Sequence, residues 1–372
     1  MRAIYAARAA RAYVAMQHRF HTPSGRYRRD GRVRIPGVPA HLWPFARALV
    51  ATLDLAGIGD GLVDGIDFEA EISDRLEALE AYWDSDRLPP AYSSDVRGSR
   101  LGGDRYYDDN AWVGLALVQH ARMYGDSGYL DRAEELFRFA QAGWAEHQRP
   151  NPGGVFWVEQ GRGVGVKNHD RNTVSTAPNA QLGMHAAELQ GRSPGTVGGA
   201  GAHEMYEWVL ATLDASHETD TPGTGLFADK IRGDGTIDRT LWSYNQGSMV
   251  AVNVLLARDP AGAPTEYLAR AEAIARKALR HFAGGYERQP PAFNAIFFRC
   301  LLLLHHATED ARLRDEIIDA IRGYVDRAWS QSRDRRDRFT FVNDGVTLLN
   351  QSAMVQLLAL LAWEPSRYGL LA

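Results

Sequence analysis

Two adjacent aspartates, Asp108 and Asp109, stand at the predicted start of an apolar helix and are flanked by Tyr107 and Trp112. Aspartate is common in the first turn of a helix, where its carboxylate caps free N–H groups and interacts favourably with the helix dipole. One carboxylate is enough for a cap, so the second carboxylate and the aromatic neighbours require another explanation. Two carboxyl groups, one ionised and one protonated, are what hydrolysis of a glycosidic bond requires. The pair is therefore predicted to be catalytic.

Aromatic, amide and carboxylate side chains recur where other apolar helices are predicted to begin. Aromatic rings stack on the C–H faces of sugars, and sugar hydroxyls need hydrogen-bond donors and acceptors. The run at residues 242–247, Trp-Ser-Tyr-Asn-Gln-Gly, is the most informative because Tyr, Asn and Gln are unusual core residues. The predicted sugar-binding residues are Trp43, Tyr107, Trp112, Trp157, Asn172, Thr176, Asp229, Trp242, Tyr244, Asn245 and Gln246.

Hydrophobic periodicity and helix punctuation predict an all-α protein with twelve helices. No segment with the alternating pattern of a strand competes with them, and the best strand candidate, residues 154–158, is short and lies in a loop. The predicted helices are Ala3–His18, Leu42–Leu55, Asp67–Tyr82, Asp108–Tyr124, Tyr129–Gln148, Pro178–Gln190, Ala202–Ser216, Gln246–Leu256, Thr265–Phe282, Phe293–His306, Ala311–Trp329 and Leu348–Leu361.

The predicted helices alternate in character along the chain. Even-numbered ones are apolar on all sides, which is typical of buried helices, whereas odd-numbered ones carry charge on one face, as surface helices do. Six inner and six outer helices predict an (α/α)6 barrel. Turns from inner to outer helices are expected to be tight, as at residues 125–128. Long loops at residues 83–107, 149–177, 217–245 and 330–347 are expected to gather at the end where the inner helices begin and to carry the function.

The composition excludes several classes of function. A net charge of −4 gives no electrostatic reason to expect nucleic acid as a partner. Cys300 is the only cysteine, which excludes an internal disulfide or a thiolate metal cluster. The histidines lack the i, i+4 spacing of a zinc helix. We therefore expect neither a metal nor another cofactor.

The closed ring of helical hairpins predicts one domain over residues 1–372. The glycine-rich stretch Gly191–Gly201 resembles a linker, but six hairpins must close into one ring, so it is interpreted as a loop between helices. Arginines interrupt the Ala-rich N-terminus, which therefore lacks the apolar core of a signal peptide. No apolar run reaches the length of a membrane span, and a cytoplasmic location is expected. No feature of the sequence specifies an oligomeric state.

At these residues the chain resembles glycoside hydrolase family 76, the endo-α-1,6-mannanases. The family hallmark, an Asp-Asp pair followed by Ala-Trp, is matched by residues 108–112, Asp-Asp-Asn-Ala-Trp. A second signature, Trp-Thr-Tyr-Asn-Gln-Gly, is matched by residues 242–247 with one Thr-to-Ser change. Residues 153–157 and 234–238 are similar to two further family segments. The chain departs from the family at Thr176, where Asn is usual, and at Val113, where a second aromatic is common.

The resemblance implies hydrolysis of α-1,6-mannosidic linkages in a mannose-containing oligosaccharide or glycan. It implies a retaining mechanism, with Asp108 as nucleophile and Asp109 as general acid/base. Two alternatives stay open. A sugar epimerase or uronyl hydrolase would use the same barrel, although the epimerases depend on inner-helix histidines that are scarce here. A non-catalytic glycan-binding barrel would be expected to lack a catalytic carboxylate, whereas both are present.

Overall fold

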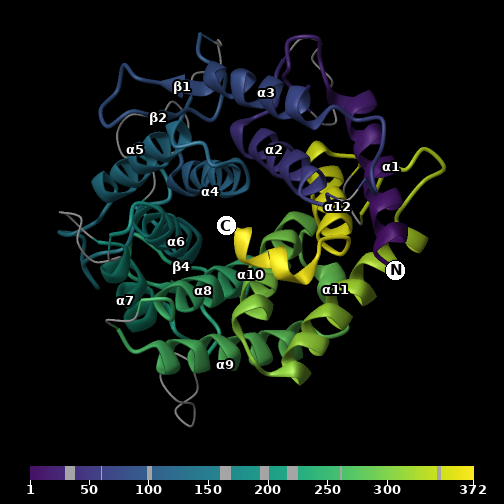
Figure 1. The fold of residues 1–372 in the computed structure, drawn as a ribbon. Coiled ribbons are helices and arrows are strands. Elements are labelled where there is room, and N and C mark those ends of the chain that lie inside the picture. Colours follow the sequence, from purple (N-terminus) through teal and green to yellow (C-terminus); the bar gives the residue numbers. More distant parts are fainter. Residues whose placement is uncertain are drawn as a thin grey trace.

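In the part of the chain that the structure describes, twelve α-helices form two concentric rings, as the sequence predicts (Figure 1). The computed structural model describes residues 1–29, 38–59, 61–98, 103–159, 169–192, 201–215, 225–259, 262–341 and 345–372. The inner helices are α2 (Leu42–Ala56), α4 (Tyr107–Tyr124), α6 (Thr173–Leu189), α8 (Ser243–Leu256), α10 (Pro291–Ala307) and α12 (Leu348–Leu360). The outer helices are α1 (Arg2–Phe20), α3 (Phe68–Leu79), α5 (Gly128–Ala142), α7 (Ala202–Leu213), α9 (Pro264–Phe282) and α11 (Ala311–Gln331).

The inner ring is closed. Each inner helix packs against the next one, and α12 returns to pack against α2. Every residue of α8 is buried, whereas the outer helix α9 buries only one face. Gly247 allows α8 and α10 to approach closely, because a Cβ at this position would lie 2.7 Å from the Cα of Phe297. The alternation of apolar and amphipathic helices therefore corresponds to an (α/α)6 barrel.

Two predicted helix boundaries were wrong by several residues. Helix α6 begins at Thr173 and contains Pro178 within it, whereas the prediction placed this proline at the helix start, its usual position. Helix α5 ends before Gly143, well short of the predicted Gln148. The helix cannot continue as predicted because Trp144 pairs with Val155 in a β-bridge. The other predicted helices match the structure more closely.

The inner-to-outer turns are not uniformly tight. Residues 125–127 and 308–310 form short turns, and Gly125 ends α4 in the left-handed conformation with φ 72°. Residues 57–67 form a longer connection between α2 and α3. The connection between α6 and α7 contains the predicted loop Gly191–Gly201, of which residues 193–200 lie outside the described part of the chain. A 3₁₀-helix, η3 (Pro365–Leu370), packs on α10 and α4.

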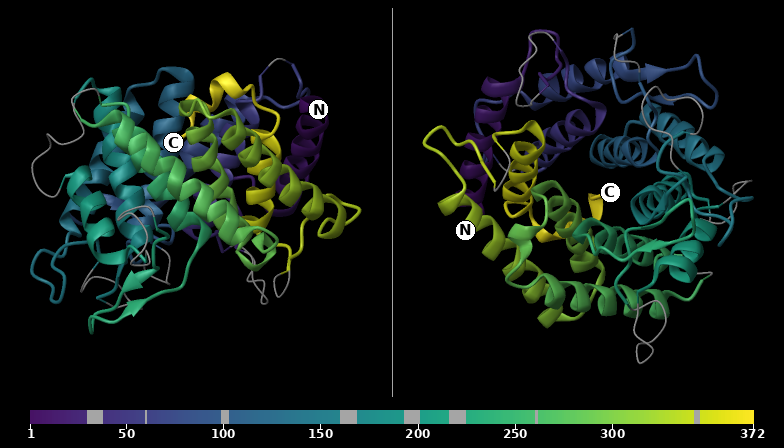
Figure 2. Two further views of the ribbon diagram at one scale, coloured as in Figure 1. Left: turned by 90° about the horizontal axis from the view of Figure 1, so that it is seen from below. Right: turned by 180° about the vertical axis from the view of Figure 1, so that it is seen from behind.

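Long loops and all the short strands lie at one end of the barrel, opposite the C-terminal segment (Figure 2, left). Strands β1 (Trp83–Asp84) and β2 (Ala91–Tyr92) pair in one antiparallel ribbon. Strands β3 (Arg171–Asn172), β4 (Lys230–Ile231) and β5 (Ile237–Asp238) form a second antiparallel sheet. Two further 3₁₀-helices, η1 (Glu80–Tyr82) and η2 (Tyr286–Arg288), precede α4 and α10. This is the end where the inner helices begin.

A polar side chain at the fourth residue of five inner helices binds the backbone of the loop that precedes its helix. Four of these side chains accept a hydrogen bond from a backbone N–H group of that loop. Asn110 accepts from Tyr92 (2.8 Å), Thr176 from Val155 (3.1 Å), Gln246 from Phe227 (2.7 Å) and Gln351 from Phe339 (3.0 Å). The fifth, Asn294 of α10, donates to the carbonyl of Tyr286 (2.8 Å). Helix α2 has Phe45 at this position. These side chains, here called the loop anchors, satisfy buried backbone groups that would otherwise lack partners.

Deeper in the barrel, a buried polar network links the inner helices. Arg299 of α10 forms an ion pair with Asp54 of α2 and donates to Gln119 of α4. Gln119 also donates to Asp54 (2.9 Å), and the Trp363 indole donates to the Asp54 carbonyl (2.7 Å). Because each charge has partners, the network ties three inner helices together without leaving an unpaired charge. Among the described residues, no helix combines the length and apolar character needed to cross a bilayer.

We expect Gln351→Leu to lower the free energy of unfolding by roughly 2–4 kcal/mol, because it leaves the Phe339 N–H and the Asp337 carbonyl without partners and removes a second donor from the Ala12 carbonyl. Urea denaturation followed by circular dichroism measures the change. The control is Gln331→Leu, at an exposed position on α11. Equal unfolding free energies for the two variants would contradict a stabilising role for the loop anchor.

Candidate functional site

A cavity of about 890 Å³ opens where the six inner helices begin. Every inner helix, or the residue just before it, contributes to its wall. The lining residues are His41, Trp43, Pro44, Ser94, Tyr106, Asp108, Asp109, Trp112, Trp157, Asn172, Val174, Asp229, Lys230, Trp242, Tyr244, Pro290, Phe293, Thr347 and Leu349. The predicted aspartate pair therefore shares one cavity with seven of the predicted sugar-binding residues.

The Asp108 carboxylate accepts two hydrogen bonds. The backbone N–H of Asp109 donates to Oδ1 (2.9 Å), and the indole N–H of Trp157 donates to Oδ2 (3.1 Å). Burial raises the pKa of Asp108 to about 7, although both hydrogen bonds act in the opposite direction and favour the ionised form. Asp108 is thus half-buried, in an environment prepared to hold a negative charge.

Asp109 is in a different environment. Its carboxyl group accepts no hydrogen bond from any residue that the structure describes. Burial raises the pKa of Asp109 well above its usual value, and the neighbouring charge of Asp108 raises it further. As pH rises, the pair therefore loses its first proton mainly from Asp108, and Asp109 retains the second.

A third carboxylate, that of Asp229, lies in the same cavity. Burial raises the pKa of Asp229 to about 6, although Lys230 lowers it. Lys230 itself is ion-paired with Asp170 (2.8 Å). The pKa of the Tyr244 hydroxyl is raised by burial and then by the charges of Asp229 and Asp108, so this phenol stays protonated and can donate a hydrogen bond.

Backbone pairing between loops places these groups beside one another. Tyr106 pairs with Val158, and Phe156 pairs with Arg171 at the edge of the β3–β4–β5 sheet. The Trp157 backbone is held on both sides: its N–H donates to the Asp170 carbonyl (3.0 Å), and its carbonyl accepts from the Tyr107 N–H (3.1 Å). These contacts make a continuous antiparallel ladder that fixes the Trp157 indole against the start of α4.

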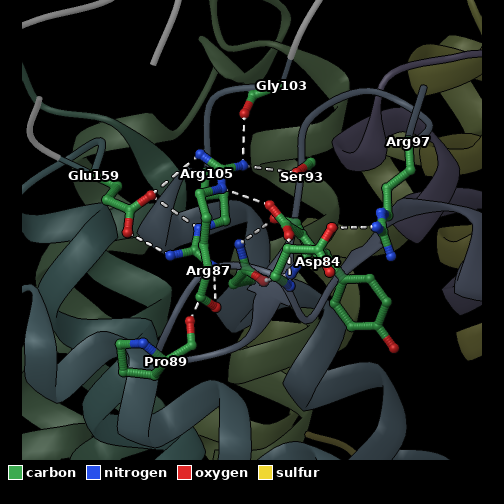
Figure 3. A network of polar contacts seen from close by, with 11 residues as sticks. Asp84, Arg87, Pro89, Ser93, Arg97, Gly103, Arg105 and Glu159 are labelled. Carbon is green, nitrogen blue, oxygen red and sulfur yellow. Dashed lines mark hydrogen bonds and ion pairs between the residues drawn. The ribbon is translucent and has the colours of Figure 1, made fainter. Parts of the chain in front are cut away.

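Ahead of α4, a buried ionic network holds the loop in place (Figure 3). The Arg105 side chain is fully buried and binds both carboxylate oxygens of Glu159. It also donates to the Pro89 carbonyl (2.9 Å). Arg87 forms ion pairs with both Asp84 and Glu159. Arg105 and Glu159 lie on adjacent segments of the ladder, so the network and the backbone pairing reinforce each other.

On the wall formed by α8, α10 and α2, aromatic rings pack together. Tyr244 stacks on Phe293 with ring centroids 3.9 Å apart and an interplanar angle of 10°. Trp242 and Trp43 contact the same ring at 5.4 Å and 6.1 Å. Trp112, on α4, also lines the cavity. Rigid rings beside carboxylates suit a ligand with both apolar faces and hydroxyl groups.

Four predicted sugar-binding residues do not line the cavity. Tyr107 points outward and stacks on Phe139 of the outer helix α5, with centroids 4.4 Å apart. Thr176 and Gln246 are loop anchors with no exposed surface. Asn245 is fully buried, and a side-chain hydrogen bond from it lowers the pKa of Asp229.

Several lining residues were absent from the predicted set. Most are single residues without a motif: His41, Pro44, Ser94, Tyr106, Val174, Lys230, Pro290, Phe293, Thr347 and Leu349. Some carried a usable signal, since Pro290, Phe293, Thr347 and Leu349 lie at the predicted starts of inner helices. His41 also directly precedes a predicted inner helix, whereas Ser94 gave no signal, because only the folded chain brings its loop to this end of the barrel. No group of three or more His, Cys, Asp or Glu side chains in the described residues could hold a metal ion.

Comparison with known proteins identifies relatives of this chain. The profile of glycosyl hydrolase family 76 matches residues 9–362. No curated protein matches the chain. A family 76 mannosidase from Bacteroides thetaiotaomicron superimposes with a TM-score of 0.77 at 22% identity, covering 96% of this chain and 98% of that chain.

Two other solved structures share the fold. One is an inactive α-1,6-mannanase variant from Salegentibacter sp., with two adjacent aspartates changed to asparagine, in complex with α-1,6-mannotriose. Its TM-score is 0.73 at 18% identity, covering 96% of this chain and 99% of that chain. The other is Dfg5 from Chaetomium thermophilum in complex with glucosamine, with a TM-score of 0.68 at 15% identity, covering 96% and 90%.

We expect Asp109→Asn to raise the melting temperature at pH 8 by about 2–4 °C and to have little effect at pH 4. The pKa of Asp109 is raised in the folded state, so the folded protein loses stability as pH rises from the unfolded pKa of about 4 through the folded value. Asparagine does not ionise and removes this loss. Differential scanning calorimetry across pH measures it, with Asp131→Asn, exposed in the first turn of α5, as control. A gain that does not change with pH would contradict the electrostatic explanation.

Proposed function

Because this chain belongs to glycosyl hydrolase family 76, we propose that it hydrolyses α-1,6-mannosidic linkages with retention of configuration. In this proposal Asp108 is the nucleophile and Asp109 is the general acid/base. The observation that carries the assignment is the difference in hydrogen bonding within the pair: Asp108 accepts two hydrogen bonds, and Asp109 accepts none from the described residues.

This difference matches the two roles. A nucleophile must be ionised before it attacks, and donors directed at both oxygens of Asp108 favour that form. A general acid must hold its proton until the bond breaks, and burial beside an anion does this for Asp109. The positive end of the α4 dipole also favours an anion in the first turn, where both residues lie.

The reaction then takes two steps. Asp108 attacks the anomeric carbon while Asp109 gives its proton to the glycosidic oxygen, so that a glycosyl ester forms and the rest of the glycan leaves as an alcohol. In the second step Asp109 takes a proton from water, and the resulting hydroxide attacks the anomeric carbon. The ester bond breaks, Asp108 leaves as the carboxylate, and two inversions give net retention.

Two solved relatives support mannose as the sugar and the 1,6-linkage as the bond. The Bacteroides structure is described as a mannosidase, and the Salegentibacter enzyme was captured with α-1,6-mannotriose after its adjacent aspartates were replaced. In the present chain, an adjacent pair occupies a cavity with aromatic walls and a third carboxylate, Asp229. Asp229 and the protonated Tyr244 hydroxyl are suited to bind hydroxyl groups of the mannosyl ring next to the pair.

The competing functions gain less support from the site. Epimerases of this barrel type depend on histidines, and His41 is the single imidazole among the described lining residues. A binding-only barrel has no need for two buried carboxylates that share one proton near pH 7. Such an arrangement makes the doubly ionised pair unfavourable, and groups with shifted pKa values of this kind are common in active sites.

Linear α-1,6-mannooligosaccharides test the proposal. We expect wild-type protein to release an α-anomer first, as seen by proton NMR within the first turnovers. Asp109→Ala should lower kcat/KM by about 10²–10⁴-fold, and Asp108→Ala by at least as much. Asp131→Ala, remote from the cavity, is the matched control. An initial β-anomer would contradict retention, and full activity of either catalytic-pair variant would contradict the assigned roles.

Trp157→Phe tests the environment of the nucleophile. We expect the acidic limb of the kcat/KM profile to move to higher pH, because removal of the indole donor raises the pKa of Asp108 above about 7. Activity at pH 6 should therefore fall more than activity at pH 8, as measured with one mannooligosaccharide across pH. Trp144→Phe, outside the cavity, should leave the profile in place. Equal losses at both pH values would show that the indole does not act through ionisation.

A further inference from the structure

One part of the cavity takes no part in the steps described above. On the α2 side, three lining residues combine an imidazole, an aromatic ring and a hydroxyl: His41, Trp43 and Ser94. The backbone N–H of Leu42 donates to the Ser94 carbonyl (2.9 Å), which joins the start of α2 to the loop that carries Ser94. This group, here called the α2 patch, is built by two loops that meet only in the folded chain.

His41 is held in one orientation. It is the N-cap residue of α2, and its Nδ1 lies 3.2 Å from Oδ1 of Asp95. Arg29 pairs with the same Asp95 oxygen and also donates to the Pro39 carbonyl (3.0 Å). Burial raises the pKa of Asp95, but the contacts with His41 and Arg29 outweigh it, so the pKa lies below its ordinary value and Asp95 is a carboxylate.

A carboxylate beside Nδ1 fixes the tautomer of the imidazole. Nδ1 carries the proton and donates to Asp95, which leaves Nε2 for a second partner. No described residue bonds to Nε2 of His41, and 49% of the side chain is exposed. The histidine is thus oriented by a buried partner, while its other nitrogen stays available at the cavity wall.

The chemistry of the α2 patch suits a neutral sugar. Among the described residues, Arg29 at this patch is already paired with Asp95, and Lys230 of the same cavity with Asp170, so neither offers an unpaired positive charge to an anionic ligand. Nε2 and the Ser94 hydroxyl can bind sugar hydroxyls, and Trp43 provides an apolar face. A cavity of about 890 Å³ lies at the upper end of the range for small-ligand sites, which leaves room beyond one sugar ring.

We propose that His41, oriented by Asp95, forms a second sugar-binding subsite with Trp43 and Ser94, which binds a mannosyl residue of the chain beyond the one at the catalytic pair. The inference rests on the proposed function, since it assumes that the substrate is a mannooligosaccharide. In this arrangement His41 is a specificity residue that favours longer substrates. Asp95 is a positioning residue that acts through His41.

A purely structural role predicts a different result. Arg29, Asp95 and His41 also tie the loop before α2 to the loop after β2, so their loss could simply destabilise the fold. A tether that only stabilises would change the melting temperature and would affect all substrates alike. A subsite affects only substrates long enough to occupy it.

The test compares kcat/KM across α-1,6-mannooligosaccharides from the dimer to the hexamer. For His41→Ala we expect little change with the shortest substrate that wild-type protein cleaves. With longer ones we expect a loss of about threefold to tenfold, mainly through KM, as for one lost hydrogen bond. His41→Gln, which keeps a polar group at the wall, should recover part of the loss, and Asp95→Asn should lose less than His41→Ala.

His203→Ala is the matched control, because His203 is also half-exposed (45%) and lies 3.8 Å from the Glu207 carboxylate, but on outer helix α7. Isothermal titration of α-1,6-mannotetraose into Asp109→Asn, with and without His41→Ala, measures binding without turnover and should show the same fold-change. If His41→Ala lowers kcat/KM equally at every chain length, or leaves mannotetraose binding unchanged, the subsite proposal is overturned and the proposed function still stands. Failure of wild-type protein to cleave any member of the series would overturn the proposed function and the subsite with it.

Discussion

The loop anchors are the interaction on which the cavity end of this barrel depends. Long loops that cross the end of a barrel bring backbone N–H and carbonyl groups into a dry interior, where each group needs a partner. The barrel meets this need on five of its six inner helices with one polar residue each, placed one turn inside the helix start. Asn110, Gln246 and Gln351 each bind loop backbone both as donor and as acceptor. The same bond therefore completes the core and fixes the loop.

Once the loops are fixed, their backbones pair with one another and form the surroundings of the aspartate pair. The ladder that runs through Trp157 carries an indole from one loop to a carboxylate on another element, a contact that no single loop could make. Arg105 and Glu159 add a buried ion pair across the same two segments. Precise placement matters here because a hydrogen bond to Asp108 changes which member of the aspartate pair ionises first.

The sequence predicted the barrel and drew attention to the aspartate pair that lines the cavity, because both appear as local patterns. Apolar and amphipathic helices alternate regardless of loop structure, and Asp108 and Asp109 are adjacent in the chain. Gln246 and Thr176 were misassigned because a polar residue at a helix start looks the same whether it faces a ligand or a distant loop backbone. Tyr107 was misassigned for a different reason: each residue turns by about 100° along a helix, so Tyr106 faces the cavity and Tyr107 faces Phe139.

Two opposing electrostatic effects meet at the cavity end. The N-termini of the inner helices converge there, and their dipoles favour negative charge. Burial and the mutual repulsion of Asp108, Asp109 and Asp229 favour protonation. Neither effect alone separates the two adjacent aspartates, which lie in the same turn at the same depth. Among the described residues, hydrogen bonds reach only Asp108, one of them from Trp157 on a loop, and they favour its ionised form, whose charge in turn raises the pKa of Asp109. Under the proposed roles, the long loops therefore decide which carboxyl group attacks and which one keeps its proton.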